Sequence, residues 1–154
     1  MDFELDFRIE EREPLKVLGM RRMAAADGFE ERYAGLYRKA FQKKLQVVGA
    51  PIAVYHDQRM DGQISDIEAA LPVNSDAEGV RELPGGTHCC VTHKGPYSTL
   101  PLTYAFLGMW LLENGYRISG APYNLYVRGG NDKILPPEQY ITEIFVPVEK
   151  IGKD

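Results

Sequence analysis

One pattern of residues occurs twice in this chain, and each copy places a glutamate at the same point of an otherwise apolar strand. Each copy has a Gly-Ala-Pro triplet and later a Glu four residues before a Pro: residues 49–51, 68 and 72, then residues 120–122, 143 and 147. When Pro72 is laid on Pro147, Glu68 falls on Glu143. A repeat about half the chain long that occurs only twice predicts a duplicated domain rather than a solenoid. We expect a ligand cleft between the halves, with an acid at its floor.

The length of 154 residues suits one domain with a single core. We expect that domain to span residues 1–154, with the two repeats at about 5–75 and 80–150. Each half has one stretch with helical spacing of its apolar residues, flanked by strand-like runs. The pattern predicts an α+β fold of tandem duplicated β-α-β-β units, in which a concave antiparallel sheet carries two helices that flank the cleft.

The boundaries of these elements follow from periodicity, proline and glycine. In chain order we expect a strand over 7–20 broken at Pro14, a helix from Asp27 to Gly49, strands over 51–56 and 64–73, a strand over 87–93, a helix over 99–114, and strands over 123–128 and 140–148. The polar segment 74–79 is the expected connection between the halves.

The charge of the chain excludes several classes of partner. A formal net charge of −4 and few clustered basic residues argue against direct binding of nucleic acid, which needs Lys and Arg side chains for the phosphates. No apolar run approaches the roughly 20 residues that cross a bilayer, and residues 1–4 do not resemble a signal peptide. We therefore expect a cytoplasmic protein that binds neither nucleic acid nor membrane.

The two cysteines are adjacent, in a strand-like run that also holds two histidines. Neighbouring strand residues point to opposite faces, so a disulfide between Cys89 and Cys90 is geometrically poor. The same alternation separates His88 and Cys90 from Cys89 and His93, which argues against a tetrahedral zinc site. We expect buried reduced thiols, no metal and no cofactor. The chain also lacks a phosphate-binding glycine loop, a nucleophile elbow and a zinc-protease motif.

Glu143 is the strongest candidate for a functional carboxylate. Strand alternation places it on one face with Phe145 and Pro147, while both faces of that strand look apolar. A buried charge without a partner is costly, so Glu143 is protonated, paired or available to a ligand; a partly solvated strand face is the alternative. Glu68 repeats the position but looks more polar in its surroundings.

Aromatic side chains are the second candidate group. The sequence has nine Tyr, six Phe and one Trp, and a carboxylate among aromatic faces is suited to a lipophilic cation. Plain core packing is the alternative for each aromatic residue. The candidate ligand-binding residues are Glu143, Trp110, Tyr33, Tyr37, Tyr104 and Glu68.

Three segments together resemble the GyrI-like small-molecule-binding family of the SOUL/GyrI-like superfamily. They are His93-Lys94-Gly95-Pro96-Tyr97, the following helix through Tyr116, and residues 142–148, and the resemblance covers essentially the whole chain. That family includes the effector-binding domains of AraC-type and MerR-type multidrug regulators and the gyrase-inhibitory proteins. The resemblance implies a ligand held between two helices, with Glu143 as the ligand-facing glutamate. Too few residues precede the first strand for a helix-turn-helix, so we expect a stand-alone form.

Three functions remain open at this point. The first is a binding module for bulky hydrophobic, cationic small molecules, with Glu143 as the counter-charge. The resemblance also implies a second, a hydrolase of electrophilic cyclopropanoid compounds, in which Glu143 and an aromatic residue such as Tyr126 are catalytic. The third is an inhibitory partner of a protein such as DNA gyrase. The oligomeric state and the identity of the ligand do not follow from the sequence.

Overall fold

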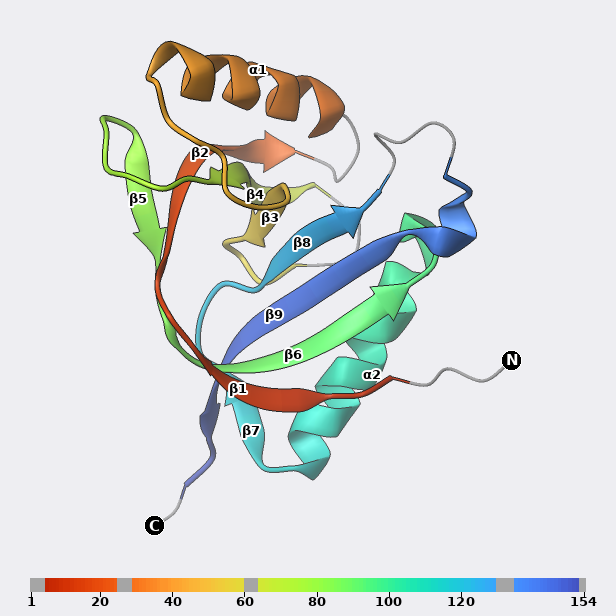
Figure 1. Ribbon diagram of the computed structural model, residues 1–154. Coiled ribbons are helices and arrows are strands. Elements are labelled where there is room, and N and C mark those ends of the chain that lie inside the picture. The colour runs from red at the N-terminus through yellow and green to blue at the C-terminus, as the bar shows by residue number, and fades with distance from the viewer. Residues whose placement is uncertain (1–4, 25–28, 60–63, 130–134, 153–154) are drawn as a thin grey trace.

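The computed structural model describes residues 5–24, 29–59, 64–129 and 135–152. Its elements are β1 (Arg8–Arg12), β2 (Leu15–Ala24), α1 (Phe29–Gln42), β3 (Ile52–Tyr55), β4 (Ser65–Pro72), β5 (Val80–Leu83), β6 (Gly86–Lys94), the 3₁₀ turn η1 (Tyr97–Thr99), α2 (Leu100–Glu113), β7 (Tyr116–Ile118), β8 (Tyr123–Arg128), the 3₁₀ turn η2 (Pro137–Gln139) and β9 (Ile141–Lys150). The described strands pair in the order β1-β6-β9-β8-β3-β4-β2-β5, and β7 pairs with the end of β9 (Figure 1).

The sheet is antiparallel throughout and has two corresponding halves, β2-β4-β3 and β6-β9-β8, which meet where β3 pairs with β8. On β4, Pro72 lies opposite Val17 of β2, and on β9, Pro147 lies opposite His88 of β6. The strand register therefore repeats between the halves. The expected α+β architecture, with two β-α-β-β units on one antiparallel sheet, is confirmed.

Each half is preceded by an edge strand, β1 or β5, and the sequence patterns predicted no strand at β5. The break expected at Pro14 separates β1 from β2, and there the chain crosses from the second half of the sheet to the first. As a result β1 pairs with β6 of the second half, while β5 pairs with β2 of the first. The segment between β1 and β2 lies against the segment between β5 and β6: a Cβ on Gly85 would lie 2.6 Å from the carbonyl oxygen of Arg12. A side chain at Gly85 would therefore force the crossing apart.

Both helices pack on the same face of the sheet, one on each half (Figure 1). The core under α1 includes Leu36, Ala69 and Leu71, and the core under α2 includes Leu107 and Ile144. The opposite face has its own apolar core, to which both halves contribute: Val17, Ile52, Val54, Ala70, Leu83, Cys90, Tyr123 and Phe145. Because residues from both ends of the strand order meet there, this second face is the inside of the curled sheet.

The helix ends follow the local sequence. Gly115 adopts a φ of +76° directly after α2, a conformation that suits glycine and ends the helix there. α2 spans 100–113, as expected, whereas α1 spans 29–42 and ends seven residues before Gly49, its expected terminator. The expected cap Asp27 lies outside the described residues. None of the described helices is long and apolar enough to cross a membrane.

Candidate functional site

Five tyrosines from different elements gather on the helix-covered face, over the junction between the two halves. We call them the tyrosine cluster: Tyr33 of α1, Tyr55 of β3, Tyr97 of η1, Tyr104 of α2 and Tyr126 of β8. Tyr55 and Tyr126 belong to one packed group with Ala53 and Ile67. Tyr33 and Tyr55 are almost fully buried, whereas Tyr97 is 37% exposed. The cluster therefore reaches from the sheet to the surface.

The cluster is held by ring contacts and by hydrogen bonds of the phenol groups. The ring of Tyr97 meets the ring of Tyr126 edge-on, with centroids 5.4 Å apart, and lies 5.0 Å from the ring of Tyr140. The Tyr33 hydroxyl donates to the carbonyl oxygen of Ile52 at 2.6 Å. The hydroxyl of Tyr55 interacts with those of Tyr104 and Tyr126. These contacts fix aromatic groups of both helices relative to the central strands.

Burial further favours the neutral form of four of these phenols. Desolvation raises the pKa values of Tyr33, Tyr55, Tyr104 and Tyr126 well above their ordinary range. The cluster therefore offers aromatic faces and uncharged hydroxyl groups at neutral pH. Such a surface suits an apolar or aromatic guest, and the ring faces attract a cation.

Two fully buried polar side chains lie on the same face of the sheet as the cluster. Thr142 of β9 pairs directly with Tyr126, and Asn124 of β8 donates from its Nδ2 to the hydroxyl of Tyr104. The hydroxyl oxygen of Thr142 and the Oδ1 of Asn124 have no hydrogen-bond partner within the described part of the chain. We call this pair the polar floor.

The turn before α2 explains how Tyr97 reaches the cluster. His93 is buried between this turn and α2: its Nδ1 lies 2.7 Å from the hydroxyl of Thr103, and its Nε2 lies 3.0 Å from that of Thr99. Burial lowers the pKa of His93, so its ring acts as a neutral structural group. Gly129 leaves the room that Tyr97 needs, because a Cβ there would lie 2.0 Å from the Tyr97 hydroxyl oxygen. The segment from His93 to Tyr97 thus positions one wall of the cluster.

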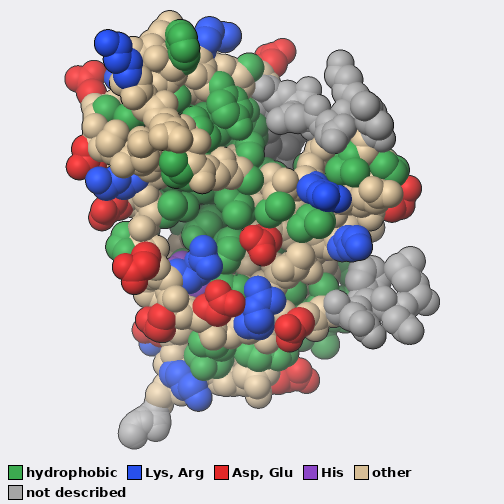
Figure 2. Space-filling model, in the orientation of Figure 1, with side chains coloured by type: hydrophobic (Ala, Val, Ile, Leu, Met, Phe, Trp, Pro, Cys, Tyr) green, Lys and Arg blue, Asp and Glu red, His purple; other side chains and the backbone are tan. Residues whose placement is uncertain are grey.

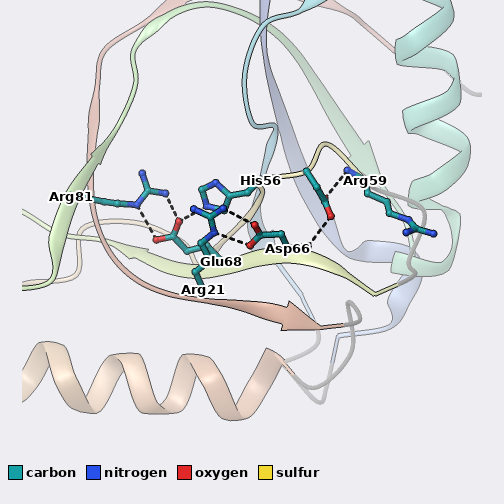
Figure 3. A network of polar contacts seen from close by, with 7 residues as sticks. Arg21, His56, Arg59, Asp66, Glu68 and Arg81 are labelled. Atoms are coloured by element: carbon teal, nitrogen blue, oxygen red, sulfur yellow. Dashed lines mark hydrogen bonds and ion pairs between the residues drawn. The ribbon is translucent and has the colours of Figure 1, made fainter.

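Glu68 lies on the opposite face of the sheet, at the centre of a polar network (Figure 3). Its carboxylate accepts hydrogen bonds from Arg81 of β5 and contacts the Nε2 of His56 at 2.7 Å. The carboxylate lies over Gly19, where a Cβ would come within 2.0 Å of its Oε2. The neighbouring Asp66 accepts two hydrogen bonds from Arg21, at 2.8 and 2.6 Å. Glu68 is therefore already neutralised by groups of the protein.

Glu143 also lies on the inner face and not among the tyrosines. It pairs with Thr92 and with Leu125, and it shares its face with Phe145. Because successive strand residues point to opposite faces, Glu143 and its neighbour Thr142 are on opposite sides of the sheet. In Figure 2 this side of β6 and β9 shows apolar side chains near its centre with acidic and basic groups around them. The structure thus does not bring Glu143 together with Tyr126, the pair expected in a hydrolase.

Of the other predicted site residues, some lie in or near the tyrosine cluster and one does not. Tyr33 and Tyr104 are members of the cluster, and Tyr37, 42% exposed, lies one helical turn after Tyr33. Trp110 is not part of the cluster. Its ring stacks on the rings of Phe7 and Tyr116, with centroids 5.8 and 6.3 Å away. Trp110 therefore packs against β7 and the N-terminal segment rather than against the tyrosines.

Sequence reasoning missed Tyr55, Tyr97, Asn124 and Thr142. Strand alternation was a usable signal for three of them, because Asn124 and Tyr126 share a face, and the pairings of β8 with β3 and β9 carry that face across the sheet. Tyr97 is in a turn, and nothing in its local sequence indicates which way its ring points.

The adjacent thiols are free and buried on opposite faces of β6. Cys89 belongs to the core under α2 and Cys90 to the inner core. Burial raises the pKa of Cys89 to about 11 and that of Cys90 to about 12, so both are unreactive thiols at neutral pH. In the described ranges, no three His, Cys, Asp or Glu side chains are grouped so that they could hold a metal ion.

Residues 5–149 match the GyrI-like small molecule binding domain, which covers both halves and both helices. The chain belongs to the GyrI-like family. Its fold is that of a small-molecule-binding domain, as the sequence resemblance implied. No curated protein matches the chain in sequence.

Several solved structures share the fold of this GyrI-like chain. It superposes on the C-terminal domain of EcmrR with a TM-score of 0.79 and 25% identity, over 96% of this chain and 99% of that domain. In the EcmrR–DNA complex the TM-score is 0.81 at 24% identity, and the chain spans 58% of the length of EcmrR. A hydrolase from Listeria innocua shares the fold at 16% identity, with a TM-score of 0.70 over 93% of this chain and 91% of that one.

Proposed function

We propose that this GyrI-like domain binds bulky, largely apolar small molecules at the tyrosine cluster, with a preference for cations. The observation that carries the proposal is the convergence of five tyrosines from α1, α2, η1 and the two central strands. Aromatic faces supply contact area to a bulky guest, and each ring that faces a cation adds about 0.5–2 kcal/mol. A further likeness supports a large organic cation: the structure of SAV2435 bound to tetraphenylphosphonium shares the fold at 15% identity, with a TM-score of 0.56 over 94% of each chain.

Isothermal titration with tetraphenylphosphonium tests the proposal. We expect saturable binding in the micromolar range, about −8 kcal/mol, and weaker binding of the neutral triphenylphosphine oxide. Tyr97→Leu removes the partly exposed wall of the cluster and should weaken the cation by roughly tenfold, since aromatic contacts are worth about 0.5–1.5 kcal/mol beyond their area.

Tyr116→Leu is the matched control, because Tyr116 is a tyrosine that stacks on Trp110 outside the cluster. We expect its affinity to stay within about twofold of the unchanged chain, a difference below about 0.5 kcal/mol. An equal loss in both variants would show that the ligand does not use the cluster. No saturable binding to the unchanged chain would remove the proposal altogether.

The predicted role of Glu143 as counter-charge needs a separate test, because its side chain lies across the sheet from the cluster. Glu143→Gln keeps the shape and removes the charge. A loss of affinity for tetraphenylphosphonium without a loss for triphenylphosphine oxide would assign the counter-charge to Glu143. Unchanged affinities would leave the tyrosine rings as the source of any preference for cations.

A further inference from the structure

The polar floor under the tyrosine cluster has hydrogen-bonding capacity that the protein does not use. Asn124 and Thr142 are both 0% exposed, and the Oδ1 of Asn124 and the Oγ1 of Thr142 have no partner within the described residues. Buried polar groups in folded proteins nearly always have a partner, because an unmade hydrogen bond in the interior costs free energy. We therefore infer that a bound ligand supplies a hydrogen-bond donor to one or both of these oxygens.

Strand register places Asn124 and Thr142 near each other on one face of the sheet. Thr142 lies directly opposite Tyr126, and Asn124 precedes Tyr126 by two residues on the same strand, so Asn124 and Thr142 are diagonal neighbours on one face. Diagonal neighbours in an antiparallel pair are about 7–8 Å apart at the backbone, within reach of a shared small group. The amide group of Asn124 already donates to Tyr104, which leaves its carbonyl oxygen as an acceptor.

The surroundings favour a donor that carries positive charge. The tyrosines above the floor are neutral, and their ring faces attract cations. Neither member of the floor carries a charge, and a carbonyl oxygen accepts more strongly from a charged N–H than from a neutral one. An ammonium group bound at the floor would have an unpaired oxygen to accept its N–H and aromatic rings nearby.

We propose that the polar floor selects bulky cations that carry N–H groups, such as primary and secondary ammonium ions, over fully substituted quaternary cations. This inference rests on the proposed function, because it assigns a ligand class to the same cluster. A quaternary cation keeps the attraction to the rings but leaves both buried oxygens unpaired. A ligand with an N–H group satisfies at least one of them.

Two probes that differ only in the replacement of three N–H hydrogens by methyl groups test this selectivity. Benzhydrylammonium and its N,N,N-trimethyl derivative have the same two rings and the same charge. We expect the primary ammonium ion to bind about tenfold more tightly, the effect of one charge-assisted hydrogen bond. The side-chain amide signals of Asn124 in an NMR titration should shift with the primary ammonium ion and much less with the trimethyl probe.

Thr142→Val removes the unpaired hydroxyl and keeps the shape of the side chain. We expect it to reduce the preference for the primary ammonium ion by several-fold and to leave the affinity for the trimethyl probe unchanged. Thr92→Val, on the neighbouring strand but on the opposite face beside Glu143, is the matched control and should retain the preference.

The outcomes separate this inference from the proposed function. Equal affinities for the two probes in the unchanged chain, or tighter binding of the trimethyl probe, would overturn the selectivity while the cluster remains a cation site. Retention of the full preference in Thr142→Val, together with unshifted Asn124 signals, would also overturn it. Binding of neither probe, nor of tetraphenylphosphonium, would remove the proposed function and the selectivity with it.

Discussion

Glu68 and Glu143 occupy corresponding positions in the two halves of the sheet, yet among the described residues only Glu68 has cationic partners. Glu68 lies four residues before Pro72, which pairs with β2, and Glu143 lies four residues before Pro147, which pairs with β6. Glu68 faces Arg21 across the strand pair and is bound by Arg81 and His56, whereas Glu143 faces Thr92 and has no ion pair or hydrogen bond within those ranges.

The exchanged edge strands account for this difference. Arg81 of β5 lies opposite Val17, which corresponds in register to His88 of the second half. The residue of β1 opposite His88 is Glu10. The edge strand of the first half therefore has Arg81 at this position, and the edge strand of the second half has Glu10. As a result, the edge strand supplies a cation to Glu68 but not to Glu143.

The ion pair of Glu68 predicts a specific stability effect. Arg81→Met leaves a 4% exposed carboxylate without its guanidinium. Breaking a buried pair costs about 3–5 kcal/mol, and the 40% exposure of the Arg81 side chain reduces our expectation to about 1–3 kcal/mol. The measurement is urea unfolding followed by circular dichroism.

Arg117→Met is the control, because the pair of Arg117 with Glu149 is exposed and should contribute less than about 1 kcal/mol. The double variant Glu68→Gln, Arg81→Met should recover part of the loss, since it removes the buried charge. Equal stability of Arg81→Met and Arg117→Met would show that Glu68 does not depend on its partner.

The same network predicts a loss of stability in acid. Burial alone would raise the pKa of Glu68, but hydrogen bonds from Arg81 and His56 outweigh it and lower the pKa below the ordinary value of 4.5. A group with a lowered folded-state pKa stabilises the fold above its unfolded pKa and loses that contribution as the pH falls through the folded value. We therefore expect the free energy of unfolding to fall below pH 4.5 more steeply in the unchanged chain than in Glu68→Gln. Parallel curves would contradict the lowered pKa.

Gly19 is required by the position of the Glu68 carboxylate. A Cβ at residue 19 would lie 2.0 Å from Oε2 of Glu68, so Gly19→Ala should displace the carboxylate from Arg81 and destabilise the fold by about 1–3 kcal/mol. Gly35→Ala is a matched control in α1, where nothing lies within 4 Å of the added carbon. Helix propensity should make that variant about 0.5–1 kcal/mol more stable. Thermal unfolding of the two variants gives the comparison, and a stable Gly19→Ala chain would contradict the packing of Glu68.

The sequence predicted what depends on local periodicity and on the repeat. The two helices, the glycine at 115 that ends α2 and the order of the long strands follow from spacing and turn residues, whereas the predicted end of α1 at Gly49 was wrong. The exchange of β1 and β5 did not, because the partner of an edge strand depends on where the chain crosses, at Pro14 and Gly85, and not on the pattern inside the strand.

The site was predictable only in part for a related reason. Alternation along β9 correctly grouped Glu143 with Phe145, but both faces of that strand are apolar, so the pattern could not indicate which face the helices cover. Tyr33 and Tyr104 were found from helical spacing. Trp110 shares α2 with Tyr104, but it comes six residues later, so its side chain points to a different part of the surroundings.

The placement of Trp110 gives the last prediction. Trp110 is the single tryptophan of the chain, and its ring stacks between Phe7 and Tyr116, away from the tyrosine cluster. Trp110→Leu should therefore destabilise the fold, by about 1–3 kcal/mol for a partly buried aromatic side chain, and leave the affinity for tetraphenylphosphonium within about twofold. Urea unfolding and isothermal titration below the unfolding temperature measure the two effects separately. In the unchanged chain, saturation with the ligand should leave the tryptophan emission maximum in place and alter tyrosine absorbance. A tenfold loss of affinity in Trp110→Leu, or a shift of tryptophan emission on binding, would move the ligand site to the other side of α2.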